Sequence, residues 1–262
     1  MNPLEILRYI ADLKEAAPDE VALTVASVVG ENIDIATMRL TALRRMIDAH
    51  VANGALWNVA NRLISALEVE YESRMIRNEL SDELHIRHLQ SEVAAGSQLL
   101  FAEGERSARS FIGDGSKGRF RDKGARDRTE KGVAPYVVAN IRRFDDQVGF
   151  ALSAGFKPLV VVEVLSFCEG SAILDSRADQ ILTLAIELDV DVAIVVPTGF
   201  KVPPAICDRQ RSIIENAPSF YEIRNLKTLL TQGNSQSTLT YVMGDSRNFE
   251  RIGVAPELLV AW

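Results

Sequence analysis

The sequence predicts an α/β protein, with an all-helical N-terminal region followed by a three-layer α/β domain on a mostly parallel sheet. Three observations lead to this class. The first hundred residues repeat apolar side chains at helical spacing, two β-branched runs near 159–165 and 190–196 are typical of buried strands, and helical patterns flank those runs. Strands that alternate with helices imply right-handed crossovers and parallel pairing. The 262 residues, 47% of them hydrophobic, are enough to bury two cores.

The first three predicted helices are indicated by their boundaries as well as by their periodicity. "NPLEILRYIADLKEA" begins with Asn2 as a cap and Pro3 in the first turn. "PDEVALTVASVVG" carries acids in its first turn and ends at Gly30. "IDIATMRLTALRRMIDAHVANG" predicts a third helix, which ends at Asn53 and Gly54.

A fourth helix is predicted to be long. From Ala55 to about Ser110 the chain has no proline, and apolar residues recur every three to five positions: Leu56, Ala60, Leu63, Leu67, Tyr71, Met75 and Leu80. A helix of this length is rarely left single, so we expect it to pack in a bundle or to form a homodimer through the helical region.

A glycine-rich basic segment follows the helical region. Residues 113–132, "GDGSKGRFRDKGARDRTEKG", contain five glycines, and the stretch from Arg106 to Lys131 has nine basic and four acidic residues, a net charge of +5. Because the whole chain has a net charge of −7, the residues outside this stretch have a net charge of −12. The segment predicts either a mobile arm that neutralises nucleic-acid phosphates or a solvated linker. The basic side chains of the arm are Lys117, Arg119, Arg121, Lys123, Arg126 and Arg128.

After the basic segment, the pattern predicts the α/β domain element by element. "APYVVANIRRFDDQVGFALSAG" is amphipathic at helical spacing, "PLVVVEVLS" is a buried strand, "LDSRADQILTLAIELD" is a helix and "VDVAIVVPT" is a second buried strand. "PPAICDRQRSIIENA" predicts a helix, and "FYEIRNL" and "STLTYVMG" predict further strands. The predicted units are therefore a helical domain over 1–110, the basic segment over 111–133 and the α/β domain over 134–262.

One carboxylate stands out, because Glu163 lies inside the most apolar run of the chain. A buried carboxylate shifts its pKa, finds a cationic partner or binds a metal. Ligands of open parallel sheets lie at the carboxyl ends of the strands, where Asp175 and Asp245 are candidate companions of Glu163. Together these three acids predict a Mg²⁺ site, in which Glu163 and Asp175 are the candidate catalytic residues. The alternative is that Glu163 pairs with an arginine or points out of an edge strand.

"LVVVEVLS…DSRADQILTLAIELDVDVAIVVP" resembles the PD-(D/E)XK, restriction-endonuclease-like superfamily over about 40 of the 262 residues. The resemblance implies that Glu163 is the metal-binding acid of a central strand, and that a lysine stands two residues later or in the following helix. Leu165 and Gln180 occupy those two positions. The departure suits a divergent or inactive nuclease as well as an active one.

The sequence therefore predicts a nuclease-like protein that acts on nucleic acid, with Mg²⁺-dependent hydrolysis of a phosphodiester as its reaction. Two alternatives remain open: a non-catalytic assembly or regulatory protein that binds partners through its helical region, and a nucleotide-binding or small-molecule-binding α/β domain. We expect no membrane partner and a cytoplasmic location, because no apolar run approaches the roughly 20 residues of a membrane span and acids occupy the N-terminus. Cys168 and Cys207 are expected to be buried thiols.

Overall fold

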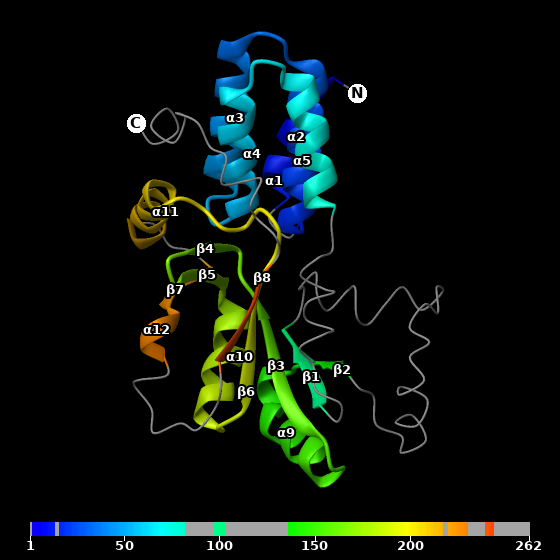
Figure 1. Ribbon diagram of the computed structural model, residues 1–262, viewed down its shortest axis with the longest axis vertical. Helices are drawn as coiled ribbons and strands as arrows, with labels where there is room; N and C mark the ends of the chain where they lie inside the picture. Colours follow the sequence, from blue (N-terminus) through cyan, green and yellow to red (C-terminus); the bar gives the residue numbers. More distant parts are fainter. Residues whose placement is uncertain are drawn as a thin grey trace, which may run out of the picture.

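A helical bundle stands on one edge of an α/β unit (Figure 1). The computed structural model describes residues 2–13, 16–81, 97–102, 136–216, 220–229 and 239–243. Its helical N-terminal region and parallel sheet confirm the predicted class. No helix in these ranges is long and apolar enough to cross a bilayer.

The bundle runs up and down between the sheet and its own free end, with short turns between successive helices (Figure 1). Asn2 and Glu5 form a capping box at its start: Leu4 N–H donates to Asn2 Oδ1 at 3.0 Å, and Asn2 N–H donates to Glu5 at 3.3 Å. The helices are α1 (Pro3–Asp12), α2 (Pro18–Asn32), α3 (Ala36–Ala49), α4 (Gly54–Ser65) and α5 (Val69–Leu80).

The prediction of one long helix from residue 55 is wrong. The helix ends at Ser65, Ala66 is extended, and α5 folds back from Val69 and packs mainly on α2. The apolar stripe is continuous in sequence because both helices turn their apolar faces to the same core. Further along the predicted helix, the chain forms strand β1 (Ser97–Phe101), which pairs with the sheet.

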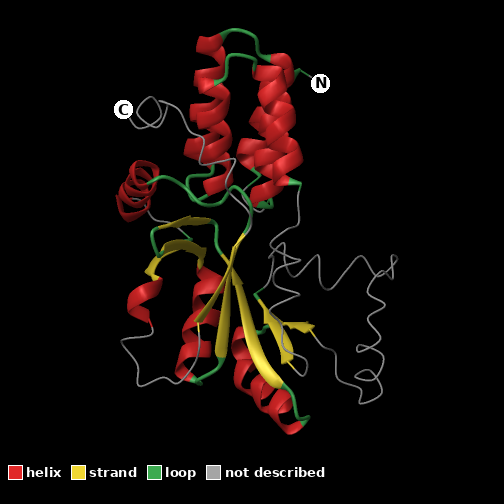
Figure 2. Ribbon diagram, in the orientation of Figure 1, coloured by secondary structure: helices red, strands yellow, loops and turns green. Residues whose placement is uncertain are grey.

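The main sheet has five strands in the order β2-β1-β3-β6-β8, and every pairing is parallel (Figure 2). The "VVV" run places β3 in the middle of the sheet, between β1 and β6. The remaining strands are β2 (Tyr136–Val138), β3 (Lys157–Glu163), β6 (Asp191–Val196) and β8 (Leu239–Met243). The predicted helix over 134–155 divides into β2, the 3-10 turn η1 (Ile141–Arg143) and α9 (Phe144–Ser153).

A smaller antiparallel sheet branches from the end of β3. Val164 N–H donates to Val195 on β6, whereas Leu165 N–H already donates to Ile173 of the small sheet. The single predicted strand therefore divides between two sheets at Glu163, and "FYEIRNL" is a strand of the small one. That sheet contains β4 (Ser166–Cys168), β5 (Ser171–Asp175) and β7 (Tyr221–Asn225), and the four-residue helix α12 (Leu226–Leu229) follows it.

Alternating side chains of the main sheet face two different clusters. Leu100, Val160 and Ile194 join the cluster that also holds the inner faces of α9 and α10 (Ser176–Glu187) and the bundle core. Leu99, Val161 and Val195 belong to a second cluster, which includes no helix of the described ranges. One continuous apolar core therefore joins the bundle to the sheet, whereas the third layer of the predicted arrangement is not among the described elements.

Candidate functional site

The junction of the bundle and the sheet lies where open α/β proteins bind ligands, at the carboxyl ends of the parallel strands. The first turn of α4 approaches this edge, and Gly54 N–H donates to Leu165 O, just beyond β3, at 2.8 Å. Asn53 caps the same helix and donates through Nδ2 to Pro18 O at 2.8 Å. The preceding helix ends at Ala49, and the Asn-Gly pair that the sequence indicates as its end is instead the start of α4.

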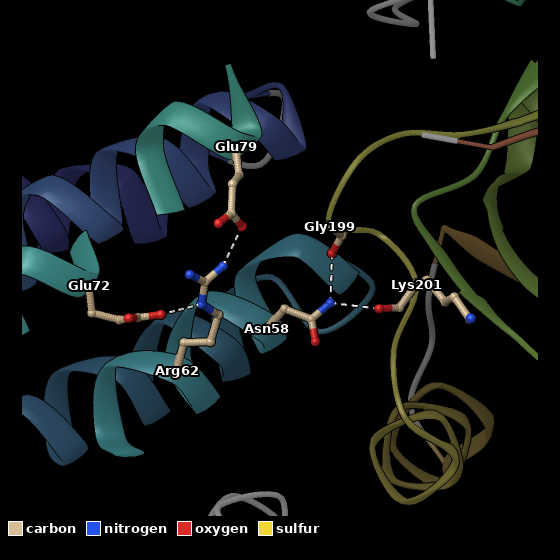
Figure 3. A network of polar contacts seen from close by, with 6 residues as sticks. All are labelled: Asn58, Arg62, Glu72, Glu79, Gly199 and Lys201. Carbon is tan, nitrogen blue, oxygen red and sulfur yellow. Dashed lines mark hydrogen bonds and ion pairs between the residues drawn. The ribbon is translucent and has the colours of Figure 1, made fainter. Parts of the chain in front are cut away.

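Asn58 joins α4 to the loop that follows β6 (Figure 3). Its Nδ2 donates to Gly199 O and to Lys201 O, each at 2.7 Å, and the side chain is fully buried. Gly199 has φ +84°, a conformation that favours glycine, and this bends the loop so that two nearby carbonyls face one amide. Asn58 therefore joins the bundle to a loop of the α/β unit that lies about 140 residues later in the sequence.

Gly54 is expected to tolerate no side chain. A Cβ at this position would lie 2.7 Å from Phe200 O and 2.9 Å from Ser166 Oγ. We expect Gly54→Ala to lower the free energy of unfolding by about 1–3 kcal/mol in urea titrations, because α4 must move off the sheet edge. Gly149→Ala, at an exposed position of α9, is the matched control: its Cβ would meet nothing within 4 Å, and alanine should raise the free energy of unfolding by about 0.5–1 kcal/mol. Equal midpoints for the two variants would contradict the tight contact.

Several buried polar atoms at the junction have no hydrogen-bond partner among the described residues. They are Asn58 Oδ1, both polar atoms of Asn61, and Thr198 Oγ1. Buried polar groups are normally satisfied by protein or by ordered water, so Asn58 Oδ1 and Thr198 Oγ1 indicate a polar spot between α4 and the loop after β6. Asn58 is not predictable as a junction residue, because an amide inside a helical stripe carries no signal of the loop it contacts.

A second polar chain fixes helix α11 (Pro204–Asn216) to the same junction. Gln210 is fully buried, accepts from Ser166 Oγ at 2.8 Å and donates through Nε2 to Val51 O at 2.9 Å. The indole N–H of Trp57 donates to the same carbonyl at 2.9 Å. The edge of the sheet is thus filled by Trp57, Asn58 and Gln210 and their partners.

Two of the three predicted acids are described, and they lie in different elements. Glu163 is the last residue of β3, half-buried, with Val195 as its neighbour on β6. Asp175 ends β5 and caps α10, where its Oδ1 accepts from Arg177 N–H at 2.9 Å. Asp245 and the six basic side chains of the segment from Lys117 to Arg128 lie outside the described residues.

The described ranges hold no group of three or more His, Cys, Asp or Glu side chains arranged for a metal ion. One oxygen of Asp175 already serves the helix cap, which leaves fewer lone pairs for a cation. The Mg²⁺ site therefore stays a prediction that no described cluster supports. Gln180, at the place of the predicted migrated lysine, is exposed on α10.

Both thiols are buried, as expected, and the structure also places them within hydrogen-bond reach of each other. Burial raises the pKa of the Cys168 thiol to about 12, and its hydrogen bond with Cys207 adds to the shift. Burial also raises the pKa of Cys207, and the same hydrogen bond opposes that shift, as expected when Cys168 S–H donates to Cys207 Sγ. Neither thiol is therefore an activated nucleophile at neutral pH.

The raised thiol pKa predicts a pH-dependent stability. The native state keeps the Cys168 proton from the ordinary pKa of 9.0 up to about 12, whereas the unfolded chain loses it. The free energy of unfolding should consequently fall as the pH rises through this window. Cys168→Ala should lose less stability than the wild type between about pH 8 and 10.5. Parallel pH curves for the two proteins would contradict the assignment.

Comparisons with known proteins identify the fold but no family. No family model matches the sequence, and no match was found among curated proteins. A chain of the tetrameric eIF2B-beta2-delta2 complex from C. thermophilum has a TM-score of 0.59 at 12% identity, with 85% of each chain covered. The translation initiation factor eIF-2B of Pyrococcus horikoshii OT3 gives 0.55 at 12%, over 77% of this chain and 80% of that one. eIF2B beta from Chaetomium thermophilum gives 0.52 at 11%, over 76% and 77%.

The likeness overturns the nuclease prediction. The chain has the fold of eIF2B beta and its relatives, across both the bundle and the sheet, and not a PD-(D/E)XK fold. The topology agrees: both neighbours of β3 are parallel, and the described partner of Glu163, on β6, is the apolar Val195. The predictions of nuclease activity, DNA binding, magnesium-dependent hydrolysis and a nucleic-acid partner are therefore wrong. The strand-helix-strand pattern that suggested them is common to many parallel sheets.

Proposed function

We propose that this protein is a non-catalytic subunit that binds protein partners and acts in assembly or regulation. The observation that carries the proposal is the shared fold over 85% of this chain and 85% of a subunit from a tetrameric complex. A coverage of 85% is too large to come from the sheet alone, so the likeness includes part of the helical bundle.

The packing of the junction supports a scaffold. The edge where a parallel sheet would hold a substrate carries the first turns of α4, with Trp57 and Asn58 fully or almost fully buried. Two hydrogen bonds from the buried Asn58 side chain, together with those of Gln210, fix the bundle to the sheet. A rigid body of this kind presents its outer faces in one fixed arrangement, which lowers the entropy cost of docking a partner.

The proposal is tested by isolating the tagged full chain from its native cells under mild conditions and measuring the mass of the intact assembly. We expect a complex of defined stoichiometry, with this chain alone or with other proteins, that survives gel filtration. A chain that stays monomeric at every concentration and co-purifies with no stoichiometric protein would refute the proposal. If a complex is found, cross-linking with mass spectrometry identifies the outer face of this chain that contacts the partner.

A second candidate, a small-anion-binding α/β domain, is favoured by a cleft of about 640 Å³. The cleft lies between the end of β2 and α10, and the residues that line it include Arg142 and Arg177 beside Ile141 and Ile181. Asn140 and Gln147 fix the β2 end, since Asn140 N–H donates to Gln147 Oε1 at 2.8 Å and Gln147 Nε2 donates to Val138 O at 3.0 Å. Two arginines near a helix N-terminus attract an anion.

Calorimetry with adenosine monophosphate, adenosine and inorganic phosphate separates the two candidates. Binding of the monophosphate that disappears in Arg142→Ala/Arg177→Ala, but not in the exposed control Arg8→Ala/Arg45→Ala, would favour the anion-binding domain. Equal heats from the wild type and both variants would remove it and leave the assembly proposal unaffected.

A further inference from the structure

The free end of the helical bundle exposes an apolar patch. We call it the bundle tip and define it by residues 31–39 and 65–72, the two turns farthest from the sheet and the helix ends beside them (Figure 1). Four large apolar side chains of the tip are 45–102% exposed: Ile35, Met38, Leu67 and Tyr71. Soluble proteins rarely gather such side chains without an interaction to cover them.

Both turns contribute to the patch, and they are neighbours in space. The first turn of α3 carries Ile35 and Met38, and the turn between α4 and α5 carries Leu67, with Tyr71 one helical turn later. Because α3 packs antiparallel on α4, the start of α3 lies beside the end of α4 (Figure 1). Methionine and tyrosine are also enriched at protein interfaces, where they adapt to a partner or bring a polar edge.

The charge around the patch is acidic. The tip has five acids and one base. Glu31 pairs with Arg77 at 2.8 Å and Glu72 with Arg62 at 2.5 Å. The other acids, Asp34, Glu68 and Glu70, are exposed. Arg39, the one base, donates to the carbonyls of Ile33 and Asp34 at 3.1 and 2.8 Å.

The acidic charge of the bundle tip favours one kind of binding partner over another. Two copies that met tip to tip would set acids against acids, which is unfavourable at short distance. A partner with basic flanks beside an apolar stripe would complement both features. An amphipathic helix has this arrangement, since its apolar residues recur on one face and its charges lie on either side.

We propose that the bundle tip is the docking surface for a basic amphipathic helix of a protein partner. The inference rests on the proposed function, because it names the surface and the chemistry of that partner. Leucine or isoleucine side chains of the helix would cover Ile35, Met38 and Leu67. Its lysines or arginines would lie near Asp34, Glu68 and Glu70.

The test uses the full chain and a synthetic helix of about 18 residues, with leucine on one face and lysine on the other. Fluorescence anisotropy measures its affinity for the wild type, for Met38→Ser/Leu67→Ser, and for the control Phe150→Ser/Leu152→Ser. The control side chains, on α9, are 57% and 58% exposed. We expect at least about a tenfold loss of affinity for the tip variant and less than about a twofold change for the control.

The charge is tested separately. Glu68→Lys/Glu70→Lys should weaken binding and flatten its salt dependence, whereas Asp145→Lys/Asp146→Lys, at exposed acids in the first turn of α9, should leave both unchanged. A peptide with glutamate in place of lysine should bind at least about tenfold more weakly. Unfolding midpoints of all variants should stay near that of the wild type, since every replaced side chain is exposed.

Three outcomes would overturn the inference: equal affinity of tip and control variants, equal binding of the acidic peptide, or a self-association that Leu67→Ser abolishes, which would make a second copy the occupant. If native complexes form and survive the tip substitutions, the proposed function stands and only the docking surface is wrong. If no complex forms in cells but the peptide still binds at the tip, the proposed function fails and the surface stands.

Discussion

Replacement of Arg62 by leucine is expected to lower the free energy of unfolding by about 3–5 kcal/mol, because it leaves two carboxylates without their cation in a mostly buried site. Arg62, on α4, has only 9% of its side chain exposed. Its Nε donates to Glu72 at 2.5 Å and its Nη1 to Glu79 at 2.6 Å, both on α5 (Figure 3). Urea unfolding followed by circular dichroism measures the loss.

Two comparisons make the Arg62 result specific. Arg143→Leu removes an exposed arginine 3.7 Å from Asp146 and should change stability by less than about 1 kcal/mol. The triple change Arg62→Leu/Glu72→Gln/Glu79→Gln should recover much of the lost stability, because no uncompensated charge remains. If Arg62→Leu is as mild as Arg143→Leu, the arginine does not hold α5 against α4.

Replacement of Asn58 by aspartate should be nearly as damaging, at about 3–5 kcal/mol. The amide that donates to Gly199 O and Lys201 O would become a carboxylate facing two carbonyl oxygens in a fully buried position. The loss should shrink as the pH falls, because burial raises the pKa of the introduced carboxyl and protonation removes its charge.

Asn216→Asp is the control for Asn58→Asp. Asn216 ends α11 and donates to Ser212 O at 2.6 Å at an exposed position. The same chemical change there should cost no more than about 1 kcal/mol, mainly through the helix dipole. Urea titrations followed by circular dichroism compare the two. A loss at Asn58 that is equal to the loss at Asn216 would show that the junction does not depend on this amide.

The sequence was a good guide where one physical rule decides the outcome. Asn2 and Pro3 fix the start of α1, and runs of β-branched residues make β3 and β6 two of the three inner strands of a parallel sheet. It failed where two elements share one pattern. The stripe from Leu56 to Leu80 continues across the turn at 66–68, since a helix that folds back on its own core keeps the same apolar spacing.

The site was less predictable than the fold. Glu163 was correctly placed at the end of its strand, but a sequence cannot show that the chain leaves the sheet one residue later, at Val164 and Leu165. It also cannot show which loop Asn58 faces, because that partner is more than a hundred positions away. Buried hydrogen bonds between residues far apart in sequence are therefore the feature that the sequence does not predict and the structure shows.

The same separation bears on how the chain folds. The bundle is built from neighbouring helices, whereas the polar contacts of the junction join residues 141, 143 and 159 positions apart. Contacts between distant residues form slowly, because a long loop must close before they contribute. We expect the five helices to collapse first and to offer α4 as a preformed surface on which the edge of the sheet closes. In stopped-flow measurements, Asn58→Ala should therefore raise the unfolding rate and hardly change the folding rate. A lower folding rate with an unchanged unfolding rate would place the junction in the folding nucleus.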